Sequence, residues 1–402
     1  MKNDFLLWLN GKEYFYIASI AATWIWAPAL FVSSDTAYNK GLLGFLLFLI
    51  PNIFTLIMFS HFAGKVRDKM DGFTLCDVIS KASIRQKNLH MLVSIVVLCC
   101  STCVQFLGIN TLLYYWFSAD KLTSAMLTSF LALAMVGKDG IKGSIISDFY
   151  KYVIMVVGGI ILLTITGIKE QHTPIFIRDT ATNTYDMLIT FGIPTVIGLM
   201  CAPYVDQTFW QRTFSIDKEK VRGIFIKSAL AFAVVPFLFG MIGFMQLSGG
   251  EFEITKYFSS GISMPLFAIC VLCALVSTLD SNLCAISSIA CTEYKKTMAV
   301  GRASMITLLI TSTLIMVYTS LSIVDLFLIY GTIRTCVALP TILIIMDKYN
   351  SKRLFIATLV TAIIFPVCFI LMPEYKGYFT ILAFITPMIG YENKGARYEY
   401  LK

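Results

Sequence analysis

Residues 274–282 read Ala-Leu-Val-Ser-Thr-Leu-Asp-Ser-Asn, and they lie inside an apolar segment that extends from 263 to 291. An apolar segment of this length can cross a bilayer, which takes about 20 residues as a helix. Four residues are spaced i, i+3, i+4 and i+7 and so share one helical face: Ala274, Ser277, Thr278 and Ser281. The stretch therefore predicts a membrane helix with a row of hydroxyl groups at mid-depth.

The whole chain has the composition of a membrane protein. Its 402 residues are 57% hydrophobic and 14% charged, whereas soluble domains carry about 25% charged residues. The apolar runs lack the period-2 alternation of barrel strands, so we predict an all-α integral membrane fold. About twelve spans are predicted: 14–34, 41–64, 89–118, 121–137, 145–167, 186–202, 223–248, 263–291, 300–322, 324–346, 353–373 and 377–391.

The positive charges predict the orientation. Of the 32 Lys and Arg residues, only six fall in the connections opposite to the N-terminal side, namely Lys40, Lys121, Lys169, Arg178, Lys256 and Lys376. The positive-inside rule therefore places segments 1–13 and 392–402 in the cytoplasm and the protein in the cytoplasmic membrane. The first segment is too polar for a signal-peptide core. The net charge of +8 follows this topology, so neither a nucleic-acid partner nor a protein partner is predicted.

Two halves of the chain have similar spacing. The first and third spans begin at 14 and 89, 75 residues apart, and the sixth and eighth begin at 186 and 263, 77 apart. Five spans per unit would give inverted repeats over 14–167 and 186–346, followed by two additional helices over 353–391. Both lead helices contain residues that interrupt helices: Pro28 in the first, and Gly192, Pro194, Gly198 and Pro203 in the sixth. We predict a break at mid-depth in each, although ordinary proline kinks are the alternative.

The hydroxyl face of the eighth span suggests cation binding. Neutral oxygens from hydroxyl groups and freed carbonyls suit a monovalent ion such as sodium, whereas isolated Ser and Thr often bond only to their own helix or to a neighbour. Asp280 strengthens the functional interpretation, because a carboxylate within the bilayer is costly. The clustered cysteines Cys99, Cys100 and Cys103 have no His or carboxylate nearby. We therefore predict no metal other than sodium.

At four places the sequence resembles the sodium:solute symporter family, which includes carriers of proline, sugars, sialic acid and urea. The matching stretches are 22–41 in span one, Gly-Ile-Lys-Gly-Ser-Ile-Ile-Ser-Asp at 140–148, Asp-Gln-Thr-Phe-Trp-Gln-Arg at 206–212, and Ser-Thr-Leu-Asp-Ser at 277–281. The resemblance covers the ten spans from 14 to 346. It implies an inverted five-plus-five fold with broken helices 1 and 6, and sodium-driven symport of a small solute by alternating access.

The resemblance also implies sites. The family's shared sodium site would use the carbonyls of Ala22, Ile25 and Ala274 and the hydroxyls of Ser277 and Thr278. A second cation site, present in some members, would fall on Asp148, Ser277, Asp280 and Ser281. The chain departs from the family at 280, often a hydroxyl residue, and at Lys151, often Gln. Two carboxylates could bind a cation more strongly or accept a proton, and Lys151 could pair with Asp148 or displace the second sodium.

The solute is less well defined by the sequence. A cavity beside the two breaks would be lined by Trp26, Ala29, Gln105, Thr195 and Arg334. Arg334 could bind a carboxylate or pair with an Asp. The stretch at 24–38 looks more like the urea-carrying branch than the sugar branch, but an amino acid, a sugar or a carboxylate stays open.

Four alternatives compete with a sodium symporter. An enzyme would need Asp148 and Asp280 to meet a histidine, but His61, His90 and His172 fall at span ends or in loops. A channel would need a continuous polar pore. A transporter-like sensor or a proton-coupled carrier working through Asp148 and Asp280 is the closest alternative. We therefore predict a transporter in the bilayer and no enzymatic activity.

Overall fold

The structure is a computed structural model. It describes residues 12–70, 72, 74–80, 84–136, 140–177, 183–246, 252–293, 297–346 and 352–391. Apart from residues 12 and 13, the predicted terminal segments 1–13 and 392–402 lie outside the described residues. The described part of the chain folds into helices and connections and contains no strand.

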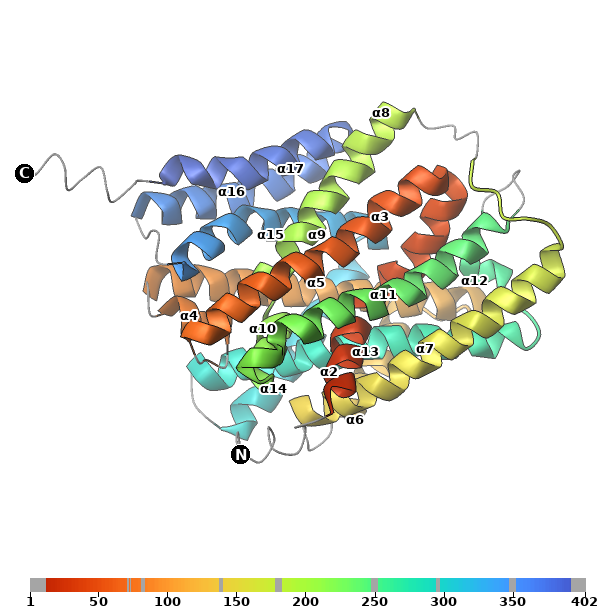
Figure 1. The fold of residues 1–402 in the computed structure, drawn as a ribbon, viewed down its shortest axis with the longest axis horizontal. Helices are drawn as coiled ribbons and strands as arrows, with labels where there is room; N and C mark the ends of the chain where they lie inside the picture. The colour runs from red at the N-terminus through yellow and green to blue at the C-terminus, as the bar shows by residue number, and fades with distance from the viewer. Residues whose placement is uncertain are drawn as a thin grey trace, which may run out of the picture.

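The helices run side by side in a single bundle (Figure 1). In chain order they are α2 (Glu13–Trp24), α3 (Ala27–Lys69), α4 (Leu75–Ser80), α5 (Ile84–Phe117), α6 (Lys121–Val136), α7 (Ile141–Glu170), α8 (Thr184–Met187), η1 (Leu188–Gly192), α9 (Ile193–Val205), α10 (Gln207–Ser215), η2 (Lys218–Lys220), α11 (Val221–Phe244), α12 (Ile254–Tyr257), α13 (Ser263–Glu293), α14 (Met298–Tyr318), α15 (Ile323–Ile345), α16 (Lys352–Leu371), η3 (Pro373–Tyr375), α17 (Lys376–Ile385) and η4 (Thr386–Gly390). Within the described ranges, nine helical segments are long and apolar enough to cross a membrane.

Three predicted spans have a different form. The first is divided between α2 and the beginning of α3, and a turn at Gly41 (φ 61°, ψ −160°) separates it from the second. Only glycine adopts this backbone region readily, which is why α3 can change direction there. The fourth is the 16-residue α6, and the twelfth is the 10-residue α17 followed by the short helix η4.

Both lead helices are broken, as predicted. The first lead helix ends at Trp24. Residues 25 and 26 are non-helical, and α3 then begins at Ala27 with a proline in its first turn. Proline fits there because the first N–H groups of a helix have no intrahelical acceptor. The second break lies at Asp206 (φ −84°, ψ 114°), between α9 and α10. It follows Pro203 by three residues, so the sixth span extends beyond the predicted end at 202.

Equivalent helices of the two halves make equivalent contacts. The first lead helix α2 packs on the fifth span α7, and the second lead helix α9 packs on the tenth span α15. Other contacts join one half to the other: the second span α3 packs on the seventh span α11, and the third span α5 packs on the eighth span α13. Gly198 allows the close contact of α9 with α15, because a Cβ there would lie 3.4 Å from the Gly331 Cα. This packing is that of a five-plus-five inverted repeat.

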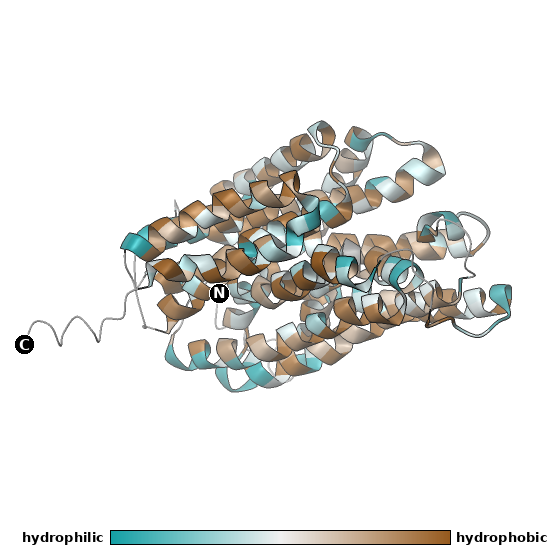
Figure 2. Ribbon diagram, turned by 90° about the horizontal axis from the view of Figure 1, so that it is seen from above, coloured by the Kyte–Doolittle hydropathy of each residue, from teal (hydrophilic) through white to brown (hydrophobic). Residues whose placement is uncertain are grey.

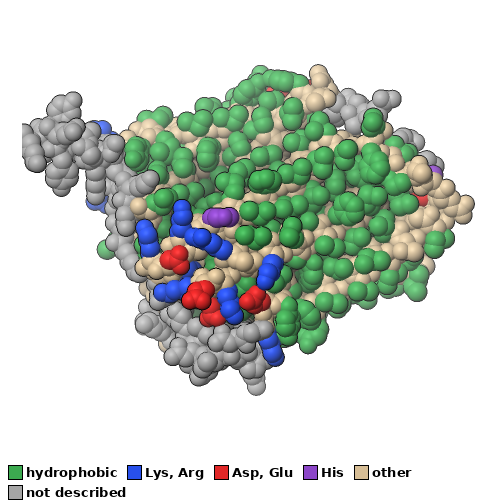
Figure 3. Space-filling model, viewed as in Figure 1, with side chains coloured by type: hydrophobic (Ala, Val, Ile, Leu, Met, Phe, Trp, Pro, Cys, Tyr) green, Lys and Arg blue, Asp and Glu red, His purple; other side chains and the backbone are tan. Residues whose placement is uncertain are grey.

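The outside of the bundle is apolar. Large hydrophobic side chains on different helices are half exposed or more, among them Phe54, Phe130, Phe237 and Ile363. Apolar residues predominate along the helices in Figure 2, and polar residues lie mainly toward their ends and the connections. In Figure 3, apolar side chains cover the face formed by α3 and α11, and charged side chains gather near the start of α11. This distribution suits a bundle surrounded by lipid.

Candidate functional site

The broken end of α2 faces the hydroxyl stripe of α13. The Thr278 hydroxyl lies 3.4 Å from the Thr23 carbonyl oxygen and 3.3 Å from that of Ala274, and the Thr23 and Ser281 hydroxyls lie 3.0 Å apart. Carbonyls in the last turn of a helix lack an intrahelical partner, and at this break the Thr23 carbonyl oxygen is directed toward α13. The first lead helix and the eighth span thus bring carbonyl and hydroxyl oxygens together.

The residues predicted for the shared sodium site are all buried, and they lie on α13 and at the break. Thr278 and the Ala274 carbonyl are in contact, and Ala22 is in the last turn of α2. The carbonyl that contacts Thr278 across the helices is that of Thr23, between the predicted Ala22 and Ile25. The Ser277 hydroxyl donates to Asp148 at 2.6 Å, which leaves its lone pairs available. Sodium ligation by these residues stays a prediction.

Four charged side chains form a buried network beside this site. The Lys151 ammonium lies 2.5 Å from an Asp280 carboxylate oxygen and 3.4 Å from one of Asp148. The Arg212 guanidinium lies 3.1 Å from the other Asp148 oxygen. None of the four side chains is more than 5% exposed. The formal charges of the two carboxylates and the two cationic side chains cancel, and this neutrality allows four charged groups to be buried together.

Hydroxyl groups complete the network. Ser19 donates to Asp148 at 2.6 Å, and Ser144 donates to Asp280 at 2.9 Å. Arg212 donates to Ser19 at 2.9 Å and to Ser281 at 2.7 Å. The fold therefore brings together the residues predicted for the second cation site: Asp148, Ser277, Asp280 and Ser281. Two protein cations, Lys151 and Arg212, contact this group. The network joins α2, α7, α10 and α13.

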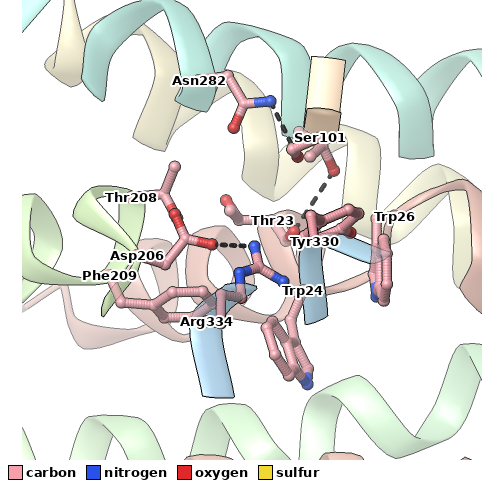
Figure 4. A pocket seen from close by; sticks show the side chains of 11 residues that line it. Thr23, Trp24, Trp26, Ser101, Asp206, Thr208, Phe209, Asn282, Tyr330 and Arg334 are labelled. Atoms are coloured by element: carbon pink, nitrogen blue, oxygen red, sulfur yellow. Dashed lines mark hydrogen bonds and ion pairs between the residues drawn. The ribbon is translucent and has the colours of Figure 1, made fainter. Parts of the chain in front are cut away.

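A small pocket lies between the two helix breaks (Figure 4). Its lining comes from α2, the two breaks, α5, α10, α13 and α15. The residues are Thr23, Trp24, Trp26, Ser101, Asp206, Thr208, Phe209, Thr278, Asn282, Tyr330 and Arg334. Thr278 belongs both to this pocket and to the predicted sodium site, so the two sites adjoin.

An ion pair lies at the centre of this lining. Arg334 donates to the Asp206 carboxylate at 2.5 Å, as Figure 4 shows, and the Thr208 hydroxyl donates to the other carboxylate oxygen at 3.2 Å. The Arg334 guanidinium also lies 4.3 Å from the centre of the Tyr330 ring. Asp206 is the non-helical residue at the second break and directly precedes α10, where a negative charge is favourable. Arg334 therefore pairs with an Asp, one of the two roles left open by the sequence.

The predicted lining of the solute cavity is only partly that of the pocket. Trp26 and Arg334 line it. Ala29, Gln105 and Thr195 are buried but are not among the described residues of its lining, and Gln105 donates to the Ser101 carbonyl at 3.2 Å. The Trp24 and Trp26 indole N–H groups and the Arg334 Nε have no hydrogen-bond partner within the described chain. Buried donors of this kind normally find an acceptor.

A larger cavity lies further along α5 and α15, where residues of α3 and of 252–255 complete its lining. It is lined by Phe31, Val32, Ser34, Asp35, Leu107, Asn110, Thr111, Phe252, Glu253, Ile254, Thr255, Leu321, Ser322, Ile323 and Val324. On α15, Phe327 follows the lining residue Val324 and precedes Tyr330 of the smaller pocket. Phe327 packs against Trp26 with ring centres 4.6 Å apart. These aromatic rings therefore lie along the helices between the two cavities.

Two charged residues of the site were missed at the sequence level. Asp206 and Arg212 belong to the quoted stretch 206–212, but the predicted sixth span ended at 202 and left them in a connection. Both are in fact buried, at 7% and 0% exposure. Charged residues at membrane depth indicate function. A longer sixth span would therefore have identified them.

The comparisons with solved structures agree with this architecture. A Na⁺-coupled sialic acid symporter, solved in a substrate-bound outward-open state, aligns with a TM-score of 0.69 at 15% identity, covering 94% of this chain and 88% of the other. Mhp1 is a nucleobase-cation-symport-1 family transporter, solved in a closed conformation with bromovinylhydantoin bound. It aligns with a TM-score of 0.68 at 12% identity, covering 94% of this chain and 91% of Mhp1. A manganese transporter of Eremococcus coleocola aligns with a TM-score of 0.58 at 12% identity, covering 94% of each chain.

Sequence comparison adds nothing further. No protein-family model matches the chain, and no curated protein matches it. At these identities the structural likeness establishes the fold, which this chain shares with the three transporters.

Proposed function

We propose that this protein is a secondary active transporter that uses a sodium gradient to drive the symport of a small polar solute by alternating access. The single observation that carries the proposal is the contact of the Thr278 hydroxyl with the carbonyl end of the broken α2. This contact provides neutral oxygens from two helices at a break in the membrane-embedded core, and Thr278 also lines the central pocket. Two of the structurally similar proteins are cation-coupled symporters according to their descriptions.

The proposed ligands of the sodium ion are those derived from the family resemblance: Ala22, Ile25, Ala274, Ser277 and Thr278. Uncharged oxygens suit a monovalent ion, because the hydration that a singly charged ion loses can be replaced without carboxylate ligands. Membership of the sodium:solute symporter family, the repeats at 14–167 and 186–346, and a cytoplasmic-membrane location with both termini inside belong to the same proposal.

The proposed solute binds at the small pocket between the breaks, which has to widen to admit it. The Asp206–Arg334 pair leaves the lining without net charge, which favours a neutral or zwitterionic molecule over an ion. Unpaired N–H groups of Trp24, Trp26 and Arg334 offer donors around the site, so the solute should present an oxygen acceptor. Movement of the aromatic rings of Trp26 and Phe327 would open this pocket to the larger cavity.

Uptake into proteoliposomes tests the function. With an imposed inward sodium gradient, the purified protein should accumulate a radiolabelled solute from a panel of urea, proline, sugars and carboxylates. A potassium gradient of equal size is the control. Solute binding without uptake would instead indicate a sensor, and uptake driven equally well by a proton gradient would indicate the proton-coupled alternative.

A further inference from the structure

The charge network raises the question of what fills the second cation site. Asp148 and Asp280 are two carboxylates on neighbouring helices, α7 and α13, at the positions that the family resemblance implies for a second cation. A buried pair of carboxylates requires a cation, because like charges in a low-dielectric interior repel strongly. The nature of that cation decides how many ions the transporter moves.

The Asp148 oxygens are already fully engaged by the protein. One oxygen accepts from Ser277 and Lys151, and the other accepts from Ser19 and Arg212. A carboxylate has about four lone-pair positions in total. Four protein donors therefore use the acceptor capacity that a bound sodium ion would need.

Asp280 and Ser281 also have protein partners, although Asp280 has fewer than Asp148. Asp280 accepts from Ser144 on one oxygen and from the Lys151 ammonium on the other. The Ser281 hydroxyl accepts from Arg212 and donates to the Ser277 carbonyl. A charge-assisted bond from an ammonium or guanidinium group is stronger than a neutral one, so a sodium ion would have to displace these groups and bring a third positive charge into the network.

We infer that the Lys151 ammonium, with Arg212 beside it, is a permanent substitute for the second cation. This inference rests on the proposed sodium coupling and adds its stoichiometry: one sodium ion binds, at the shared site, and Lys151 prevents binding of another. Lys151 is the specificity-determining residue because it bridges both carboxylates. Arg212 supports it from α10, immediately beyond the second helix break.

Sodium binding to the purified protein tests the inference. Radioactive sodium is titrated onto the wild type, Lys151→Gln and Lys151→Arg, with choline chloride holding the ionic strength constant. Lys151→Gln removes the charge and leaves one carboxylate unneutralised, whereas Lys151→Arg keeps the charge. We expect one ion per protein for the wild type and Lys151→Arg, and two for Lys151→Gln. The sodium-dependent rise in melting temperature should be correspondingly steeper in Lys151→Gln.

The possible results separate the two proposals. Two ions on the wild type, or equal numbers on wild type and Lys151→Gln, would overturn the role of Lys151. No ion on the wild type but one on Lys151→Gln would support that role and refute the shared sodium site. If Lys151→Gln does not fold, the wild type decides by itself: a count of one supports the inference, and a count of two overturns it.

Discussion

Replacing Thr278 by Val tests the sodium site most directly. Valine has the shape of threonine but lacks the hydroxyl that lies 3.4 Å from the Thr23 carbonyl. Ser277 is less suitable, because its hydroxyl also donates to Asp148. Losing one oxygen partner of a buried group costs about 1–3 kcal/mol, which corresponds to a fall of roughly 5- to 150-fold in sodium affinity. Thr278→Ser keeps the hydroxyl and is the matched control.

The assay is solute uptake into proteoliposomes at a series of sodium concentrations. Because sodium and solute affinities are linked reciprocally, Thr278→Val should also weaken apparent solute affinity at fixed sodium, and more sodium should partly restore it. Thr278→Ser should remain close to the wild type in both measurements. If Thr278→Val and Thr278→Ser have the same sodium dependence as the wild type, the ion does not bind at Thr278. Proton coupling through Asp148 and Asp280 then becomes the better explanation.

Three further predictions concern the pocket, the packing and the orientation. Asp206→Asn leaves the buried Arg334 unpaired, so it should cost about 3–5 kcal/mol of stability and lower the melting temperature, and adding Arg334→Gln should recover most of the loss. Gly243→Ala should destabilise the protein by about 1–3 kcal/mol and lower its melting temperature, because the added Cβ would lie 2.3 Å from a backbone oxygen of α3. Gly223→Ala, in the same helix but with open space around it, is the control and should leave the melting temperature unchanged. Thr173→Cys, in a background without the native cysteines, should react with an impermeant maleimide in intact cells; reaction only after permeabilisation would reverse the proposed topology.

The sequence predicted the features that depend on local composition. Long apolar runs indicated the helices, and the proline at position 28 marked the first break, because a proline fits the first turn of a helix that restarts there. The second break lies at Asp206, which has no comparable local signal. Pro203 precedes it but is accommodated within α9, so the breaker residues alone did not locate it.

The partners of the charged groups were harder to predict, because they come from distant parts of the chain. The spacing of Asp148 and Lys151 suggested an ion pair, and the Lys151 Nζ does lie 3.4 Å from an Asp148 carboxylate oxygen. The shorter contact of Lys151 is with Asp280, 129 residues away, and Arg212 reaches Asp148 from a helix that was not predicted. Such contacts depend on how α7, α10 and α13 are arranged in three dimensions.

The balanced charges of the buried network have an electrical consequence. Moving one elementary charge through the full membrane potential changes the free energy by about 2.3 kcal/mol per 100 mV. Lys151, Arg212, Asp148 and Asp280 carry two positive and two negative charges. Helix movements that keep these four groups together therefore transfer no net charge and are insensitive to voltage. If one sodium ion is coupled to each solute molecule, as proposed above, a steady current during transport of a neutral solute amounts to one charge per molecule taken up.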